Sequence, residues 1–108
     1  MPMTDLDAVF SALGDETRRA ILRRLKEGEQ PLSHLAAPFA MSQTGVTRHV
    51  RVLEEAGLVR VEKRGRVRHC SMNAQPFREA VSWLESYRPF WEERFENLAR
   101  FIAEENKT

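Results

Sequence analysis

The chain has 108 residues, of which 42% are hydrophobic and 31% are charged, and its formal net charge is +1. This length allows one domain with one modest core, and the composition is that of a globular protein rather than a disordered one. A single cysteine, Cys70, excludes an intrachain disulfide. The sequence has no signal-peptide pattern and no apolar run of the roughly 20 residues that span a membrane, so we expect a cytoplasmic protein without a membrane partner.

The positive charge is concentrated in one segment. Residues 42–69 hold seven Arg or Lys and three Glu, a net charge of +4, whereas residues 74–108 hold five basic and seven acidic residues, a net charge of −2. A local basic patch is the footprint of a nucleic-acid-binding surface.

Residues 5–13 predict a short first helix. Thr4 or Asp5 can cap it and Gly14 ends it, and its apolar stripe comprises Leu6, Val9, Phe10 and Leu13.

A second helix begins at the N-cap Asp15 and stops at Gly28, and its core candidates are Ile21, Leu22 and Leu25. Its four arginines leave two interpretations open, a solvated helix face or phosphate contacts for one or two of them: Arg18, Arg19, Arg23 and Arg24. Pro31 opens a third, short helix with Leu32, Leu35 and Ala36 pointing inward. Pro38 stops or distorts this helix, and residues 39–41 form a tight connection to the next one.

The segment from Ser42 to Gly57 predicts a helix with two unlike faces. Ser42 is its N-cap and Gly57 suits a left-handed C-terminal position, while the apolar stripe comprises Val46, Val50 and Leu53. The opposite face carries amides, hydroxyls and guanidinium groups from Gln43, Thr44, Thr47, Arg48 and Arg51. Two short helices, the second exposing polar groups, form the helix-turn-helix pattern, although many helical domains also have short corners of this kind.

A basic β-hairpin is predicted directly after this helix. Residues 58–63 and 66–72 have strand composition, with Arg64 and Gly65 in the turn. Lys63, Arg64 and Arg66 lie at the tip, which favours phosphate contacts over an ordinary polar turn. The fold class is therefore mainly α with a small β-hairpin, a winged helix-turn-helix.

Residues 74–105 predict a long last helix with a kink or break near Tyr87, because Pro89 removes a backbone hydrogen bond. Its apolar residues follow a heptad-like seam that exceeds what one small domain hides. We expect this seam and the stripe of residues 5–13 to form a two-fold dimer, although the helix could instead only close its own core. The expected interface comprises Leu6, Val9, Phe10, Leu13, Trp83, Tyr87, Phe90, Trp91 and Leu98.

Three blocks of this sequence resemble the ArsR family of winged-helix repressors. They are the Phe10-Ser-Ala-Leu-Gly-Asp-Glu-Thr-Arg-Arg stretch, residues 41–59, and the Lys63-Arg-Gly-Arg turn. The resemblance spans residues 6–73, and the aromatic tail is similar to that of a subgroup with a long last helix. It implies a homodimer whose first and last helices associate and which represses transcription by binding operator DNA.

The metal-sensing motifs of that family do not carry over. The third helix has no cysteine and the last helix has no histidine, which leaves His34, His49, His69 and Cys70 as ligand candidates. His69 and Cys70 are adjacent on a strand and point to opposite faces, so we expect no metal site and no cofactor. Cys70 is interpreted as a small strand residue, with a redox thiol as the alternative, and the sequence does not identify an effector.

We therefore expect a DNA-binding regulator and not an enzyme, since no nucleophile–base set, phosphate loop or carboxylate pair is present. Arg48 and Gln43 are the expected base readers, for guanine and adenine. Thr44 and Thr47 can meet phosphate, base or a thymine methyl group. Phosphate contacts are expected from Ser42, Arg51, Lys63, Arg64 and Arg66. The alternative is a winged-helix protein-interaction module with a merely solvated basic face.

Overall fold

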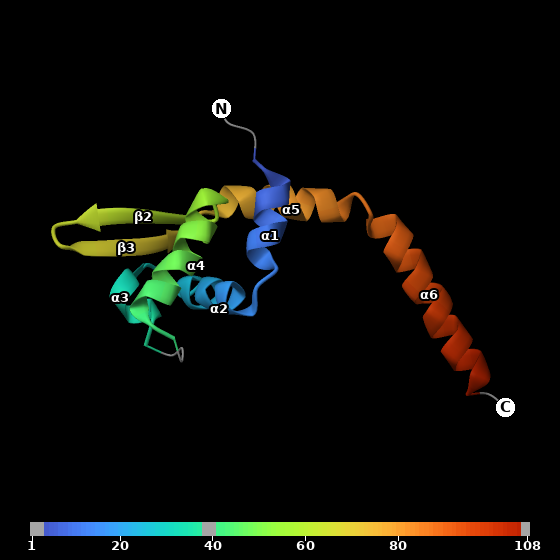
Figure 1. The fold of residues 1–108 in the computed structure, drawn as a ribbon. Helices are drawn as coiled ribbons and strands as arrows, with labels where there is room; N and C mark the ends of the chain where they lie inside the picture. Colours follow the sequence, from blue (N-terminus) through green and yellow to red (C-terminus); the bar gives the residue numbers. More distant parts are fainter. Residues whose placement is uncertain (1–3, 38–40, 107–108) are drawn as a thin grey trace.

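The computed structural model describes residues 4–37 and 41–106, in which helices dominate and three strands form one small antiparallel sheet (Figure 1). The elements in chain order are α1 Leu6–Leu13, α2 Glu16–Leu25, β1 Gln30–Pro31, α3 Leu32–Leu35, α4 Gln43–Glu55, β2 Val59–Arg64, β3 Val67–Met72, α5 Ala74–Glu85 and α6 Arg88–Glu105. The predicted winged helix-turn-helix is confirmed. The predicted effect of Pro38 and most of the predicted connection before Ser42 lie outside the described residues.

Three helices begin where the sequence predicts, each at a side-chain cap. The oxygens of Asp5, Asp15 and Ser42 each accept a hydrogen bond from the backbone N–H three residues ahead, at 3.1, 3.0 and 3.1 Å. These bonds satisfy donors that a helix N-terminus otherwise leaves free. At the other end of α4, Gly57 adopts the predicted left-handed conformation with φ +81°.

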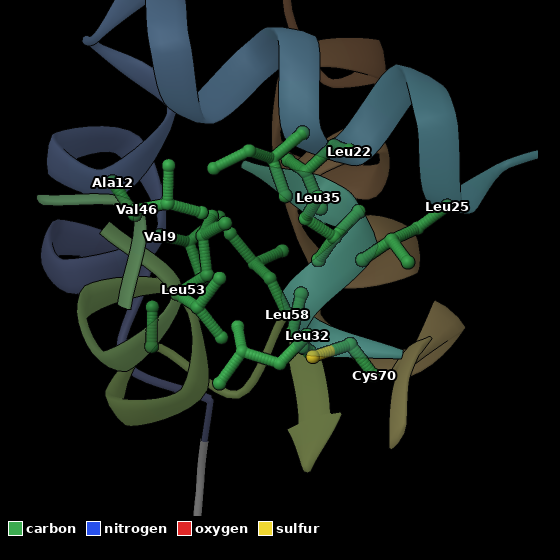
Figure 2. Close-up of a cluster of buried hydrophobic side chains, with 14 of the residues drawn as sticks. Val9, Ala12, Leu22, Leu25, Leu32, Leu35, Val46, Leu53, Leu58 and Cys70 are labelled. Carbon is green, nitrogen blue, oxygen red and sulfur yellow. The ribbon is translucent and has the colours of Figure 1, made fainter. Parts of the chain in front are cut away.

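One hydrophobic core lies between α1, α2, α3, α4, the sheet and the start of α5 (Figure 2). Every helix that the sequence predicts before the hairpin contributes to it, and the fully buried large side chains are Val9, Ile21, Leu35, Val46, Leu53, Leu58, Val59 and Cys70. Burial of this apolar surface is the main favourable contribution to folding of the domain.

The sheet contains a strand that the sequence reasoning missed. β1 pairs with β3 through Gln30 opposite Cys70 and Pro31 opposite His69, giving the order β1-β3-β2. β1 is only two residues long and ends in proline, so it shows no alternation of polar and apolar residues that would predict a strand. Proline is nevertheless tolerated in the first residue of a strand or on an edge strand. The hairpin loop is also shifted by one residue. Its two residues are Gly65, with φ +65°, and Arg66, because Arg64 pairs with Val67.

The predicted last helix is broken rather than kinked. α5 ends at Glu85, and α6 begins at Arg88 with Pro89 in its first turn, where a missing N–H costs nothing. Arg88 bridges the joint by pairing with Glu85 of α5 and with Glu92 of α6. α6 projects away from the body of the domain (Figure 1), and none of its residues is buried.

Candidate nucleic-acid interface

The two faces of α4 are separated as predicted. Val46, Val50 and Leu53 are 0–2% exposed and hold the helix to the core. The opposite face is open to solvent at four of its five predicted positions, Gln43, Thr44, Arg48 and Arg51, while Thr47 is half-buried. The apolar contacts therefore fix one side of the helix and leave its donors available on the other.

The exposed side chains of α4 differ in whether they already have a hydrogen-bond partner within the chain. The Thr47 hydroxyl donates to the Gln43 carbonyl at 2.8 Å, so this proton is already used inside the helix. The Gln43 amide lies 3.5 Å from the Leu32 carbonyl, a long contact that a better acceptor would replace. Within the described part of the chain, Thr44, Arg48 and Arg51 have no side-chain hydrogen bond or ion pair. Arg48 and Arg51 are thus the unpartnered cations of this face.

Three of the four α2 arginines do something that neither sequence interpretation foresaw. Arg18 and Arg19 donate to carbonyls at the C-terminus of α1, at 2.7 Å for both Arg18 Nε to Ala12 and Arg19 Nη1 to Leu13. Arg24 donates to the carbonyl of His34 in α3 at 2.9 Å. The last carbonyls of a helix have no partner within the helix. The guanidinium donors from α2 therefore stabilise the C-terminal ends of α1 and α3. These three arginines thus link α2 to α1 and α3 by hydrogen bonds.

In the wing, the hairpin of β2 and β3, one of the predicted phosphate-contacting cations has an acidic partner. Arg64 forms an ion pair with Glu29, which lies between α2 and β1, and His69 Nδ1 is 3.3 Å from the same carboxylate. The hairpin sequence itself has no acid between Lys63 and His69, but the fold brings one in from elsewhere. Lys63 and Arg66 are exposed and have no ion-pair partner among the described residues. At the tip of the wing the free positive charge is therefore carried by these two side chains, and the exposed Arg60 and Arg68 add positive charge on its strands.

The predicted dimer surface is partly internal. Val9 is 0% exposed in the core of its own protomer, so its assignment to the interface is wrong: α1 turns this residue toward the body of the domain. Phe10 packs edge-on against Trp83 at 5.5 Å between ring centroids, and Trp83 contacts Tyr87 at 5.0 Å. Leu6 and Leu13 are half-buried. α1 thus packs on α5 within one protomer.

Large apolar side chains remain exposed on α5 and α6. The exposed fractions are 46% for Trp83, 47% for Tyr87, 56% for Phe90 and 54% for Leu98, whereas Trp91 is half-buried. Neighbouring positions on the same helices add Val81, Leu84, Phe95, Phe101 and Ile102. Large exposed apolar surface of this kind is typical of an interaction site.

Cys70 is buried on β3, and burial raises the pKa of its thiol to about 11. Nearby Glu54 and Glu29 act in the same direction. Since the thiolate is the reactive form, this environment suppresses thiol chemistry. Over residues 4–37 and 41–106, no group of three or more His, Cys, Asp or Glu is arranged to hold a metal ion. No helix in this part of the chain is long and apolar enough to cross a membrane.

A short helix, a reading helix bounded by caps and a basic hairpin beside it define a winged-helix DNA-binding protein. A helix-turn-helix domain model matches residues 13–62. The chain is 36% identical over 87 residues to YuzN of Bacillus subtilis, an uncharacterized HTH-type transcriptional regulator, covering 73% of this chain and 95% of that one. It is 27% identical over 82 residues to the transcriptional repressor SdpR of the same organism, covering 76% and 91%.

Solved structures that resemble this chain are also transcriptional regulators. A crystal structure of an ArsR family transcriptional regulator has 41% identity and a TM-score of 0.75, covering 81% of this chain and 90% of that chain. An ArsR-like regulator from Rhodococcus has 30% identity and a TM-score of 0.69, covering 89% and 91%. The chain belongs to the ArsR family of winged helix-turn-helix transcriptional regulators, and it is a DNA-binding regulator.

Proposed function

We propose that the protein is a homodimeric repressor that reads a two-fold operator with one α4 helix in each major groove. The observation that carries this proposal is the solvent face of α4, where Arg48 and Arg51 are exposed and unpartnered within the described residues. Arginine pairs with guanine O6 and N7, and Gln43 suits adenine once its long bond to Leu32 is released. We assign phosphate contacts to Ser42, Arg51, Lys63 and Arg66.

The dimer would use residues 5–13 and 74–105. Its support is the exposed apolar surface of α5 and α6, which a second copy of the same surface would cover. On α6 the side chains of Trp91, Phe95, Leu98 and Ile102 follow one stripe at helical spacing, while Glu96 and Arg100 lie on the opposite side. A symmetric dimer would place its two half-sites about 10–10.5 base pairs apart, or a multiple of that distance.

Repression would follow because a bound dimer blocks polymerase at the promoter. We place this activity in the cytoplasm, with double-stranded DNA as the partner, with no cofactor and without enzymatic chemistry. The relatives named as transcriptional regulators and the absence of a membrane-spanning helix among the described residues are consistent with this proposal.

The test starts with selection of bound sequences from a random duplex pool, followed by affinity measurements on the selected operator and its single-base variants. Replacing Arg48 with Ala should cost about 1–3 kcal/mol and relax base preference at one position per half-site. Arg48 is chosen because its guanidinium has no competing partner in the structure.

Lys26→Ala is the control, since Lys26 is an exposed cation at the end of α2, outside the residues that we assign to DNA and to the dimer. It should bind the operator like the wild type. Equal loss across all sequences for Arg48→Ala would contradict base reading. A wild-type protein that enriches no sequence, or that sediments as a 12.5 kDa monomer, would instead favour a protein-interaction module.

A further inference from the structure

His49 lies on α4 but belongs to neither its core stripe nor its proposed DNA face. At 100° per residue it points away from Arg51, and its side chain is 23% exposed. Its Nδ1 lies 3.2 Å from Nη1 of Arg18 and 3.8 Å from Oδ2 of Asp15. The back of the reading helix is therefore attached by a polar contact to the start of α2.

Arg18 connects this histidine to α1. While Nη1 faces His49, Nε donates to the Ala12 carbonyl at 2.7 Å and Nη2 donates to the Ser11 carbonyl at 3.1 Å. The backbone N–H of Arg18 in turn donates to the Asp15 carboxylate at 3.0 Å, and this bond is the main cause that lowers the pKa of Asp15. One planar guanidinium thus spans the last turn of α1 and the middle of α4.

α1 is in turn tied to α5, because the Phe10 ring packs edge-on against Trp83. The apolar contacts between α1 and α4, such as those around Val9 and Val46, hold the two helices together but set no direction. Hydrogen bonds do set direction, since they weaken steeply away from a straight geometry. The Arg18–His49 contact is the directional link between the middle of α4 and α1. A second link lies at the far end of α4, where the side chain of Asn73, the N-cap of α5, donates to the Gly57 carbonyl at 2.8 Å.

We propose that Arg18 and His49 are positioning residues that set the orientation of α4 relative to α1, and through it the half-site spacing that the dimer accepts. This inference rests on the proposed function, since spacing has meaning only for a dimer that reads two half-sites. Adding one base pair between half-sites turns one of them by about 34–36° around the duplex axis, given 10–10.5 base pairs per turn. If Arg18 and His49 hold α4 rigidly, the dimer loses affinity when one half-site is rotated in this way. If α4 can reorient, the dimer keeps more of its affinity.

The experiment compares dimer affinity for three duplexes, the selected operator and versions with the central spacer one base pair longer or shorter. The wild type should bind the original spacer best. His49→Leu removes the acceptor and should bring the affinity ratio between spacers toward one. His49→Asn should restore the wild-type ratio, because the Asn side-chain oxygen reaches about the position of Nδ1. A role limited to stability would not change this ratio in folded protein.

Arg19→Leu is the matched control, because Arg19 also donates to a carbonyl at the end of α1, that of Leu13 at 2.7 Å, but makes no described contact with α4. It should keep the wild-type ratio, whereas Arg18→Met should lose it. If His49→Leu does not fold, Arg18→Met decides the question alone. Unchanged discrimination in both variants would overturn the inference while leaving the proposed function intact, and a wild type that binds none of the duplexes would refute the proposed function itself.

Discussion

Helices α4 and α6 are both amphipathic, but only α4 has its apolar side covered within one chain. The apolar anchors of α4 are at most 2% exposed, whereas Phe90, Phe95, Leu98, Phe101 and Ile102 of α6 are 50–66% exposed. Both patterns look alike in the sequence, since periodicity reports a face and not what covers it. The difference separates side chains whose contacts are complete within one protomer from side chains that need a partner molecule.

The largest expected effect separates the two helices directly. Leu53→Ala should lower the free energy of unfolding by about 2–5 kcal/mol, because Leu53 is fully buried in the core. Leu98→Ala on α6 should leave the stability of the protomer within about 0.5 kcal/mol. It should instead weaken self-association, so that its midpoint of denaturation depends less on protein concentration than that of the wild type.

Urea unfolding at two protein concentrations, with sedimentation of each variant, measures both quantities. A loss of several kcal/mol in monomeric Leu98→Ala would mean that α6 is packed within its own chain, and the contrast with α4 would disappear.

A smaller effect is expected in the wing, where one cation is unpaired and another is paired within the protomer. Lys63 has no ion-pair partner among the described residues, whereas Arg64 must leave Glu29 before it can reach a phosphate. Lys63→Ala should therefore reduce the slope of log affinity against log salt by about 1.8, because a dimer loses two phosphate contacts worth about 0.9 each, and Arg64→Ala should reduce it less. Salt titrations of operator binding measure both slopes.

Glu29→Gln is the accompanying control, because it frees Arg64 without altering the hairpin sequence. It should strengthen operator binding and steepen the salt dependence. An Arg64→Ala slope that falls as far as that of Lys63→Ala would show that the ion pair with Glu29 does not hold Arg64 back from DNA.

The smallest expected effect concerns a buried and an exposed thiol. Burial raises the pKa of Cys70 from its ordinary value near 9 to about 11. Cys70 should react more slowly at pH 8 with a thiol reagent than a cysteine introduced by Leu98→Cys in a Cys70→Ser background, measured below the dimerisation concentration. Comparable rates would contradict the burial of Cys70 in the core.

The same shift makes stability depend on pH. Between about pH 9 and 11 the unfolded chain releases the Cys70 proton while the folded chain keeps it, so the contribution of this thiol is present below pH 9 and is lost as the pH rises. The difference in unfolding free energy between wild type and Cys70→Ser, followed through this range, isolates that contribution.

Much of the site could be predicted from the sequence because its signals are local. Ser42 accepts from an N–H only three residues ahead, and the core stripe of α4 repeats within two turns, so both depend on neighbours along the chain. The charge difference between the hairpin region and the tail is likewise a property of sequence. These features determined the winged-helix fold, the exposed face of α4 and the apolar excess of the last helices.

The tertiary structure decided which of the exposed groups are free. Arg18 meets His49 across 31 positions and Arg64 meets Glu29 across 35, and no local pattern encodes either pairing. The same holds for β1, which exists only because β3 offers it a partner, and for Val9, which faces the core. The physical reason is that periodicity and capping act over one helical turn, whereas ion pairs, strand pairing and burial depend on how the elements pack together.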